Sequence, residues 1–465
     1  MSDRRRGLVL AICCMSLLIV GLDNTIVNVA LPAIQREFHA TVSDLQWTID
    51  SYVVVLASLL ILSGSTADRL GRRRTFQVGL VLFTGGSFLC GLAPSLGWLV
   101  AARIVQAVGG SMLNPVAMSI ITNTFTEPRE RARAIGVWSG VVGISMALGP
   151  VVGGLLVGTV GWRAIFWINI PIGLAAVVLT ALFVPESRAP RPRRPDLVGQ
   201  ALVITLLGSL TSAIIEGPVA GWSSPLIVGL FALAAAALAA LLLYEPRRAD
   251  PLLELRFFRS APFSGATLIA VSSFAALGGF LFLNTLYLQT VRGLSAAHAG
   301  LAVLPMAAMV LVFGPLSGRL VGRRGPRLPL LLAGAAIAAS GLMMLPVTAT
   351  TPLGWLIAAY AVFGFGFAVV NPPVTQTAVS GMPRAQAGVA AAIASTSRQV
   401  GQSLGVAVAG ALVASALAAT ARPLGAADLP WWLIIGYGVL VLAVTLLTTG
   451  AGLVRAEPAD LPGPL

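Results

Sequence analysis

The chain has 465 residues, of which 57% are hydrophobic and only 10% are charged, and its net charge is +13. Soluble domains carry roughly a quarter charged residues, so this composition excludes a soluble globule and predicts an integral membrane protein. In such a protein a basic excess reflects membrane topology, and we expect no nucleic-acid partner.

All of the basic residues are arginine, because the chain contains no lysine. A standard phosphate-binding loop requires a lysine, which excludes an ATPase motor within this chain. The three cysteines lie in apolar runs without metal-ligand spacing, and no nucleophile and base stand at a usable spacing. We therefore expect no enzyme, no metal site and no cofactor.

Apolar runs of about 20 residues, the length that crosses a bilayer as a helix, follow one another along the whole chain. The first run is too long for a signal peptide and lacks a cleavage site, so we interpret it as a retained span. We expect fourteen spans, at about 8–30, 45–66, 75–93, 97–122, 133–157, 163–184, 198–216, 225–244, 262–289, 298–317, 328–347, 353–378, 388–414 and 431–453.

The arginines gather in alternate loops, beginning with Arg4, Arg5 and Arg6, and are sparse in the loops between them. Arginine-rich loops stay on the cytoplasmic side. We therefore expect both termini in the cytoplasm and a multi-pass protein of the bacterial cytoplasmic membrane.

Short patterns recur in the same order in the two parts of the chain. The loop at 64–73 returns at 314–324, and Asn114-Pro115 returns as Asn371-Pro372. Such repetition indicates a duplicated architecture. It predicts an all-α protein with an N-terminal six-helix half at 1–190, two inserted helices at 191–255 and a C-terminal six-helix half at 256–465.

Four stretches support a family resemblance. GSTADRLGRRR (64–74) resembles the signature loop of the major facilitator superfamily, and LDNTIVNVALP (22–32), GVVGISMALGPVVGG (140–154) and WRAIFWINIPIG (162–173) resemble its fourteen-span drug:proton antiporter branch. The resemblance implies the major facilitator fold and multidrug efflux driven by the proton gradient. The Gly-Pro motif of the fifth span is associated with export.

Charged residues inside spans are the first functional candidates. Asp23 is the only formal charge from Gly7 to Leu31, and a charge at a helix centre costs about 2.5 to 3.5 kcal/mol. Asp23, Asp50 and Arg103 are thus candidates for proton coupling, with Asp23 or Asp50 as the partner of Arg103. A permanently bonded structural role for Asp23 is the alternative, and Asp50 is alternatively a contact for a cationic substrate or an interfacial residue.

Three further sets of residues have an expected role. The loop after the second span is expected to gate the cytoplasmic side, unless it only sets topology, through Gly64, Asp68, Arg69, Gly71, Arg72 and Arg73. The fifth span presents a smooth face for helix packing or for sliding between halves, with Gly140, Gly149, Pro150, Gly153 and Gly154. The candidates for substrate contact are Asn28, Gln106, Asn114, Asn284, Tyr287, Asn371 and Gln376.

No Asp or Glu occurs between Arg256 and Ala427, so proton coupling must use the N-terminal half. The sequence thus predicts a monomeric, proton-coupled exporter of lipophilic drugs or natural products in the lipid bilayer. The alternatives are a proton-coupled symporter that imports a nutrient and a transport-inactive receptor or scaffold.

Overall fold

The computed structural model describes residues 3–189, 195–248, 250–379, 387–420 and 429–449. The expected all-α fold is confirmed over these residues, which form helices without strands. The helices of the first part are α1 (Asp3–Phe38), α2 (Val42–Leu70), α3 (Arg72–Gly91), α4 (Leu96–Thr124), α5 (Pro128–Thr159), α6 (Ala164–Trp167) and α7 (Asn169–Phe183). They are followed by α8 (Leu197–Ala220), α9 (Pro225–Tyr244), η1 (Glu245–Arg247), η2 (Leu255–Arg259), α10 (Ala261–Leu286), η3 (Tyr287–Val291), α11 (Ala296–Ala302), α12 (Leu304–Arg324), α13 (Arg327–Met344), α14 (Leu353–Val379), α15 (Ala387–Thr420) and α16 (Leu429–Thr448).

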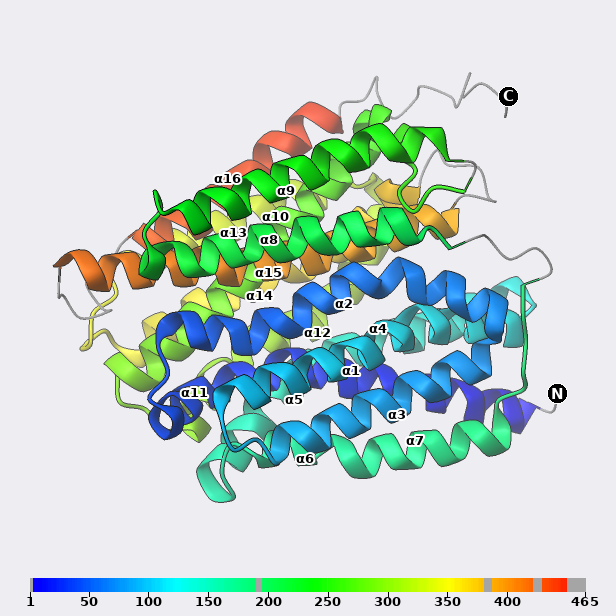
Figure 1. Cartoon of the computed structure of the whole chain (residues 1–465), viewed down its shortest axis with the longest axis horizontal. Coiled ribbons are helices and arrows are strands. Elements are labelled where there is room, and N and C mark those ends of the chain that lie inside the picture. The colour runs from blue at the N-terminus through cyan, green and yellow to red at the C-terminus, as the bar shows by residue number, and fades with distance from the viewer. Residues whose placement is uncertain (1–2, 190–194, 249, 380–386, 421–428, 450–465) are drawn as a thin grey trace.

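Twelve helical segments in the described part of the chain are long and apolar enough to cross a membrane. The helices α3 and α5, which the sequence analysis also expects to span, are not among these twelve. Both nevertheless lie within the bundle beside the candidate spans (Figure 1).

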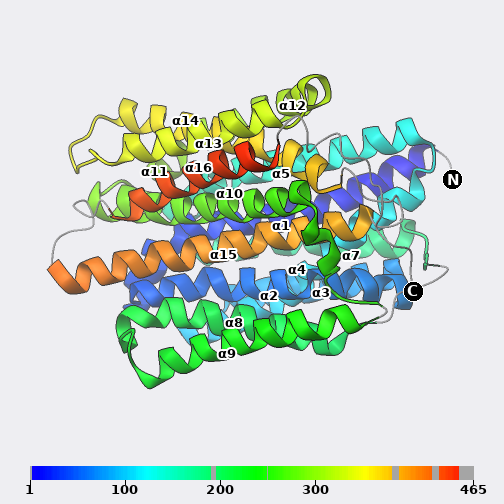
Figure 2. The same ribbon diagram turned by 90° about the horizontal axis from the view of Figure 1, so that it is seen from above.

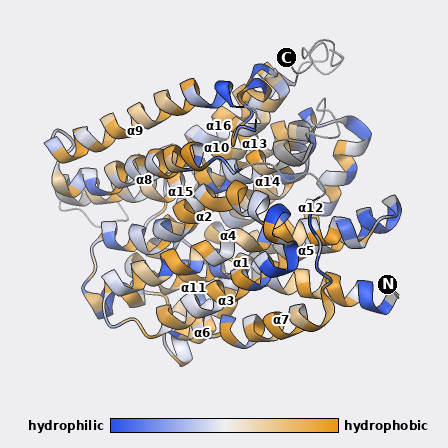
Figure 3. Ribbon diagram, turned by 45° about the vertical axis from the view of Figure 1, so that its right-hand side comes forward, coloured by the Kyte–Doolittle hydropathy of each residue, from blue (hydrophilic) through white to orange (hydrophobic). Residues whose placement is uncertain are grey.

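The long helices run nearly side by side, so the bundle has two ends (Figure 1). We call the end that holds the N-terminus and the α2–α3 loop the proximal end, and the end that holds the α1–α2 turn the distal end. Hydrophobic residues cover much of the length of the helices between these ends (Figure 3), as expected for surfaces that face lipid.

Two large apolar clusters form the core. One consists mainly of residues from α1 to α7 and the other of residues from α10 to α16. The N-terminal half, α1–α7, and the C-terminal half, α10–α16, are named here by these clusters. The expected boundary at residues 190 and 191 lies outside the described residues.

Small residues let the helices within a half approach closely. A Cβ on Gly79 of α3 would stand 2.8 Å from the Cβ of Met112 and 3.0 Å from the carbonyl oxygen of Gly109, both on α4. Close packing of this kind drives helix association in membranes, where no water is left to expel. It fixes α3 against α4 and so positions the polar residues that both helices carry.

The inserted helices α8 and α9 form a hairpin beside the two halves (Figure 2). Helix α8 packs against both α2 and α15 and is hydrogen bonded along α2. Ser43 Oγ donates to the carbonyl of Ile215 at 3.0 Å, and Gln200 Nε2 donates to the carbonyl of Ser58 at 2.7 Å. Helix α9 packs against α8 and exposes most of its apolar surface. The insert is therefore attached to the N-terminal half.

Candidate functional site

Asp23 of α1 is fully buried and bonded to Arg103 of α4. Arg103 Nη1 donates to Asp23 Oδ2 at 2.5 Å, and both side chains are at most 1% exposed. Arg103 Nε also donates to the carbonyl of Thr48 on α2 at 3.2 Å. A buried charge is tolerated when it is paired and hydrogen bonded, and this pair fulfils both conditions.

Three neutral polar side chains complete the network around Asp23. Gln106 Nε2 donates to Asp23 Oδ1 at 2.9 Å, while its Oε1 accepts from Arg103 Nη1 at 2.8 Å. Asn169 of α7 donates to Asp23 Oδ1 at 3.3 Å and to Ser87 Oγ of α3 at 3.0 Å. The network thus joins five helices of the N-terminal half around one carboxylate.

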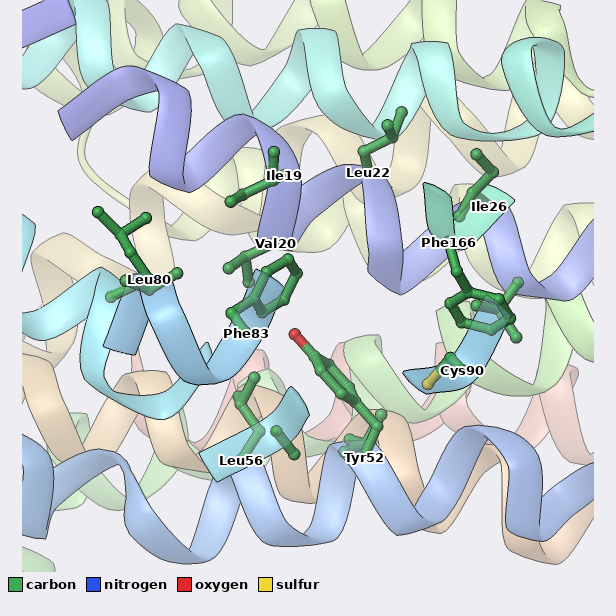
Figure 4. Packing of buried hydrophobic residues seen from close by; sticks show 14 of the residues in the cluster. Ile19, Val20, Leu22, Ile26, Tyr52, Leu56, Leu80, Phe83, Cys90 and Phe166 are labelled. Carbon is green, nitrogen blue, oxygen red and sulfur yellow. The ribbon is translucent and has the colours of Figure 1, made fainter. Parts of the chain in front are cut away.

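Aromatic rings enclose the guanidinium of Arg103. Its Cζ atom lies 4.1 Å from the ring centroid of Tyr52 and 5.8 Å from that of Phe166. Figure 4 shows Tyr52 projecting from α2 toward Phe83 of α3, with Phe166 at the far side of the same cluster. An aromatic face stabilises a cation that has lost its water, so Arg103 keeps its charge in a dry environment.

The spacing of polar residues on α4 explains this arrangement. Arg103 and Gln106 are three residues apart and therefore share one helix face, which the structure directs toward α1. Gly110, one turn further on, leaves room for the Tyr52 hydroxyl, which would be 3.0 Å from a Cβ there. Asn114 continues the stripe, and its Oδ1 is buried without a hydrogen-bond partner.

Asp50 of α2 lies apart from this network. It is two residues from both Thr48 and Tyr52, so it points to the opposite side of the helix, toward α15. It is 0% exposed, it interacts with the hydroxyl of Ser403 on α15, and neither of its oxygens has a hydrogen bond of regular geometry. Of the two partners expected for Arg103, the structure pairs Asp23 with it and not Asp50.

The two halves are joined by hydrogen bonds on the distal side of the bundle. Gln46, one turn before Asp50 on α2, donates to the carbonyls of Val406 at 3.2 Å and Ala407 at 2.7 Å on α15. Gln289 of η3 donates to the carbonyl of Val29 on α1 at 2.9 Å. These bonds end on backbone carbonyls, so they join the halves through neutral groups.

The glycines of the expected fifth-span motif contact a helix of their own half and a helix of the other half. Gly149 and Gly153 of α5 face Thr25 and Ile26 of α1 within the N-terminal half. Gly154 faces α11 of the other half, where a Cβ would stand 2.5 Å from the carbonyl oxygen of Ala296.

Other glycines on α5, α11 and α12 differ in how closely they are packed. Gly300 of α11 lies directly against the carbonyl of Pro150. Gly140, by contrast, has no neighbour within 4 Å of a Cβ built on it, and the same holds for Gly318 of α12. The contacts with the C-terminal half that these glycines of α5 show therefore lie toward its distal end.

The α2–α3 loop forms its contacts inside the N-terminal half. Arg72 Nη2 lies 2.8 Å from Asp68 Oδ1, and the carboxylate of Glu186 accepts the backbone N–H groups of Arg73 and Arg74 at 3.1 and 3.3 Å. Gly71 has a φ of +117°, and a side chain there would collide with Glu186.

The other residues of this loop add no bond between the halves. Arg69 is exposed and Gly64 is half-buried beside Pro115. In this conformation the loop bonds to the segment after α7, and its described side chains form no ion pair with the C-terminal half.

The expected substrate residues fall into different environments. Asn28 lines a small cavity of about 10 Å³ between the halves, together with Thr25, Pro150, Thr285 and Gln289, which is room for about one water. Asn284 is buried and donates to its own helix, whereas the Tyr287 hydroxyl donates to the carbonyl of Thr348 at 2.6 Å. Asn371 is half-buried and Gln376 is exposed, so the structure does not gather these residues into one site.

Sequence reasoning missed Asn169, which donates to Asp23, and Ser87, which accepts from Asn169 and from Gln106. Both are fully buried, but a single serine or asparagine in an apolar run is common, since each can bond to its own helix. The signal available was the position of Asn169 inside WRAIFWINIPIG, the segment that carries part of the family resemblance.

Comparison with known proteins agrees with this architecture. A model of the Major Facilitator Superfamily matches residues 13–406. The chain belongs to this superfamily and is a membrane transporter rather than an enzyme.

Several curated relatives share more than a third of the residues. The chain is 38% identical over 421 residues to multidrug resistance protein Stp of Mycobacterium tuberculosis (strain CDC 1551 / Oshkosh), covering 90% of this chain and 78% of the relative. It is 39% identical over 401 residues to the tetracenomycin C resistance and export protein of Streptomyces glaucescens, covering 86% and 74%. It is 37% identical over 403 residues to the methylenomycin A resistance protein of Streptomyces coelicolor, covering 84% and 82%.

Solved structures of other transporters have the same fold. A bacterial homologue of the human lysosomal transporter Spinster superposes with a TM-score of 0.67 at 19% identity, covering 97% of this chain and 98% of that one. A D-xylose–proton symporter also gives a TM-score of 0.67, at 15% identity, covering 95% and 97%. At these identities the likeness concerns the fold alone.

Proposed function

We propose that the chain exports lipophilic drugs or small-molecule natural products in exchange for protons. The relatives named for multidrug resistance, for tetracenomycin C resistance and export and for methylenomycin A resistance support the efflux of such compounds. The proton gradient supplies the energy, and the cycle uses no other cofactor. The protein works as a monomer.

Asp23 is the observation that carries the proposal. It is a buried carboxylate in the middle of α1, and its partner Arg103 comes from another helix of the same half. A proton on Asp23 cancels its attraction for Arg103, which keeps its bonds to Gln106 and to the Thr48 carbonyl. Loss of the proton restores the pair, so the packing of α1 against α4 depends on proton occupancy.

Asp50 is the second carboxylate that takes part in the proposed proton cycle. Its carboxylate faces α15 across the seam between the halves and lies on the same face of α2 as Gln46, which bonds to α15. A charged Asp50 is disfavoured in this dry seam. We assign to it a role in coupling protonation to the closure of α2 on α15.

The arginine-rich loops support a cytoplasmic location for the proximal end and hence for both termini. In this orientation α3 and α5 also span the bilayer, which makes fourteen spans in all. The distal bonds of Gln46 and Gln289 then close the outer side, and the open glycines Gly140 and Gly318 belong to a state that faces the cytoplasm.

Alternating access follows from a rocking motion of the two halves, with the insert carried by the N-terminal half. When the distal seam opens and the proximal side closes, Asp68 and the arginines of the α2–α3 loop approach the C-terminal half. Glycines at the α5 seam allow the sliding that this motion requires.

The nature of the substrate follows from the charge distribution. The C-terminal half has no Asp or Glu between Arg256 and Ala427, so its surface toward the other half carries no carboxylate for a dication. A neutral or singly charged lipophilic compound fits such a surface. Asn28, which lines the small cavity between the halves, supplies an amide for hydrogen bonding to it.

Substrate-dependent proton movement in everted membrane vesicles tests the proposal. We expect the wild type to release protons from the vesicle lumen when a lipophilic substrate is added. In Asp23→Asn the rate of this release should be at least about tenfold lower. The exposed acid Asp250 provides the control, because Asp250→Asn should respond as the wild type. Normal coupling in Asp23→Asn would refute the assignment.

A further inference from the structure

A second buried acidic site lies at the proximal end of the inserted hairpin. Asp196 precedes α8 and is 3% exposed, and Glu245 follows α9 and is 1% exposed. Asp196 Oδ1 caps α8 by accepting the N–H of Gly199 at 2.9 Å, and it also accepts the hydroxyl of Tyr244 at 3.2 Å. Glu245 Oε2 accepts the N–H of Leu253 at 3.4 Å.

The other oxygen of each carboxylate is buried without a hydrogen-bond partner among the described residues. These oxygens are Asp196 Oδ2 and Glu245 Oε1. Both face Gly199, since a Cβ there would stand 2.9 Å from Asp196 Oδ2 and 2.6 Å from Glu245 Oε1. The two unbonded oxygens therefore share one small space that exists because residue 199 has no side chain.

Few charges compensate this pair among the described residues, which do not include 190–194. Arg248 Nε lies 3.9 Å from Asp196 Oδ2, but its side chain is 43% exposed and so is partly screened by water. Tyr244 is the other described titratable group for which a contact with the pair is found. Leu241, one turn before Glu245, belongs to an apolar cluster with Leu252, and Ile61 of α2 packs against this cluster. Within the described part of the chain, one half-exposed cation thus faces two buried carboxylates.

Two buried carboxylates whose free oxygens face one small space do not both stay ionised, because repulsion and lost hydration favour one proton between them. We infer that Asp196 and Glu245 hold one shared proton, with the protonated carboxyl donating to the free oxygen of its neighbour. The site binds a proton that is distinct from the one assigned to Asp23, since it lies in the insert and has no contact with Arg103.

The shared proton acts as a latch. It joins the start of α8 to the end of α9, and through Leu253 it also holds the segment that leads to the C-terminal half. When the proton leaves at alkaline pH, the two negative charges repel and this segment is released from the insert. The link between insert and C-terminal half therefore responds to cytoplasmic pH.

Glu245→Gln tests the latch, because its amide donates to Asp196 as the protonated acid does but cannot lose a proton at these pH values. We expect the thermal midpoint of the purified wild type to fall as the pH rises from about 5 to about 8, because the folded pair keeps a proton that the unfolded chain has lost, and to level off once the pair has ionised. The midpoint of Glu245→Gln should stay level over this range. A variant whose midpoint falls as in the wild type would overturn the inference.

A control and a spectroscopic readout complete the experiment. Glu254→Gln changes an acid of the same segment that is paired with Arg256 at 3.8 Å, and it should retain the pH dependence of the wild type. Infrared difference spectra should contain a protonated-carboxyl band at neutral pH that disappears in Glu245→Gln and persists in Glu254→Gln. A band that is unchanged in Glu245→Gln would show that the pair holds no proton.

Discussion

Asp23 and Asp50 are both fully buried, yet only Asp23 has a basic partner among the described residues. Asp23 faces Arg103 inside the N-terminal half, whereas Asp50 lies on the other side of α2 and faces α15. One acid therefore lies in the packing within a half and the other at the contact between halves, and breaking the pair of Asp23 should cost stability whereas neutralising Asp50 should not.

Arg103→Ala is expected to destabilise the protein by about 3 to 5 kcal/mol, because it leaves Asp23 charged and unpaired in the core. The double variant Asp23→Asn with Arg103→Gln should recover most of this loss without recovering proton coupling. Thermal unfolding in detergent measures the first effect and vesicle transport the second.

Arg163→Ala is the matched control for that series. It removes a salt bridge of similar length, in which Arg163 Nη2 lies 2.7 Å from Glu37 Oε1. The side chains of this pair are 31% and 40% exposed. Exposed pairs contribute at most about 1 kcal/mol. Equal losses in Arg103→Ala and Arg163→Ala would contradict the burial argument.

Asp50→Asn is expected not to lower the thermal midpoint, since it removes a buried carboxylate without a hydrogen bond of regular geometry. It should nevertheless reduce substrate-dependent proton movement by about tenfold, because the group facing α15 no longer titrates. Ser403→Ala tests the contact itself and should change the pH profile of transport. An intact profile in both variants would remove Asp50 from the mechanism.

A disulfide across the distal seam should lock the transporter. The side chain of Gln46 lies directly against Gly410 of α15, so cysteines at these two positions, in a chain whose Cys13, Cys14 and Cys90 are replaced, are expected to cross-link and to stop transport. Reduction should restore it. Cysteines at Gly140 and Gly318, which have open space around them, serve as the comparison and should not cross-link in the same state. Full transport by the cross-linked 46/410 variant would show that this seam does not open.

Gly300→Val should prevent distal closure, because the side chain would enter the space of the Pro150 carbonyl. Transport is expected to fall at least about tenfold, while the amount of folded protein stays close to that of the wild type. Gly229→Val on α9, where a Cβ meets nothing within 4 Å, should leave transport unchanged. The ratio of transport rate to protein level in vesicles checks both.

The main features of the fold were predictable because membrane burial restricts the chain to helices and because hydropathy marks their length. The number of membrane spans was harder to predict. Helix α3 carries arginines at its start and polar residues along its length, so its apolar character is weaker than that of its neighbours, although its contacts hold it inside the bundle.

The site was predictable where residues are costly to bury. Asp23, Arg103 and Gln106 stand out in apolar runs for this reason. Ser87, Asn169 and the carbonyl of Thr48 do not, because small polar groups and backbone atoms leave no distinct pattern in a sequence. The partners of the α2–α3 loop were also out of reach, since Glu186 binds this loop through the backbone N–H groups of Arg73 and Arg74.

The position of α8 has a consequence for how a membrane-dissolved compound arrives. Helix α8 lies against both α2 and α15 and so roofs one of the two lateral seams between the halves, with α9 as a second layer outside it (Figure 2). No described helix covers the seam between α5 and α12 in this way. In the proposed export cycle, a compound dissolved in the bilayer would therefore reach the space between the halves from the α5–α12 side, and the inserted hairpin would block the opposite side.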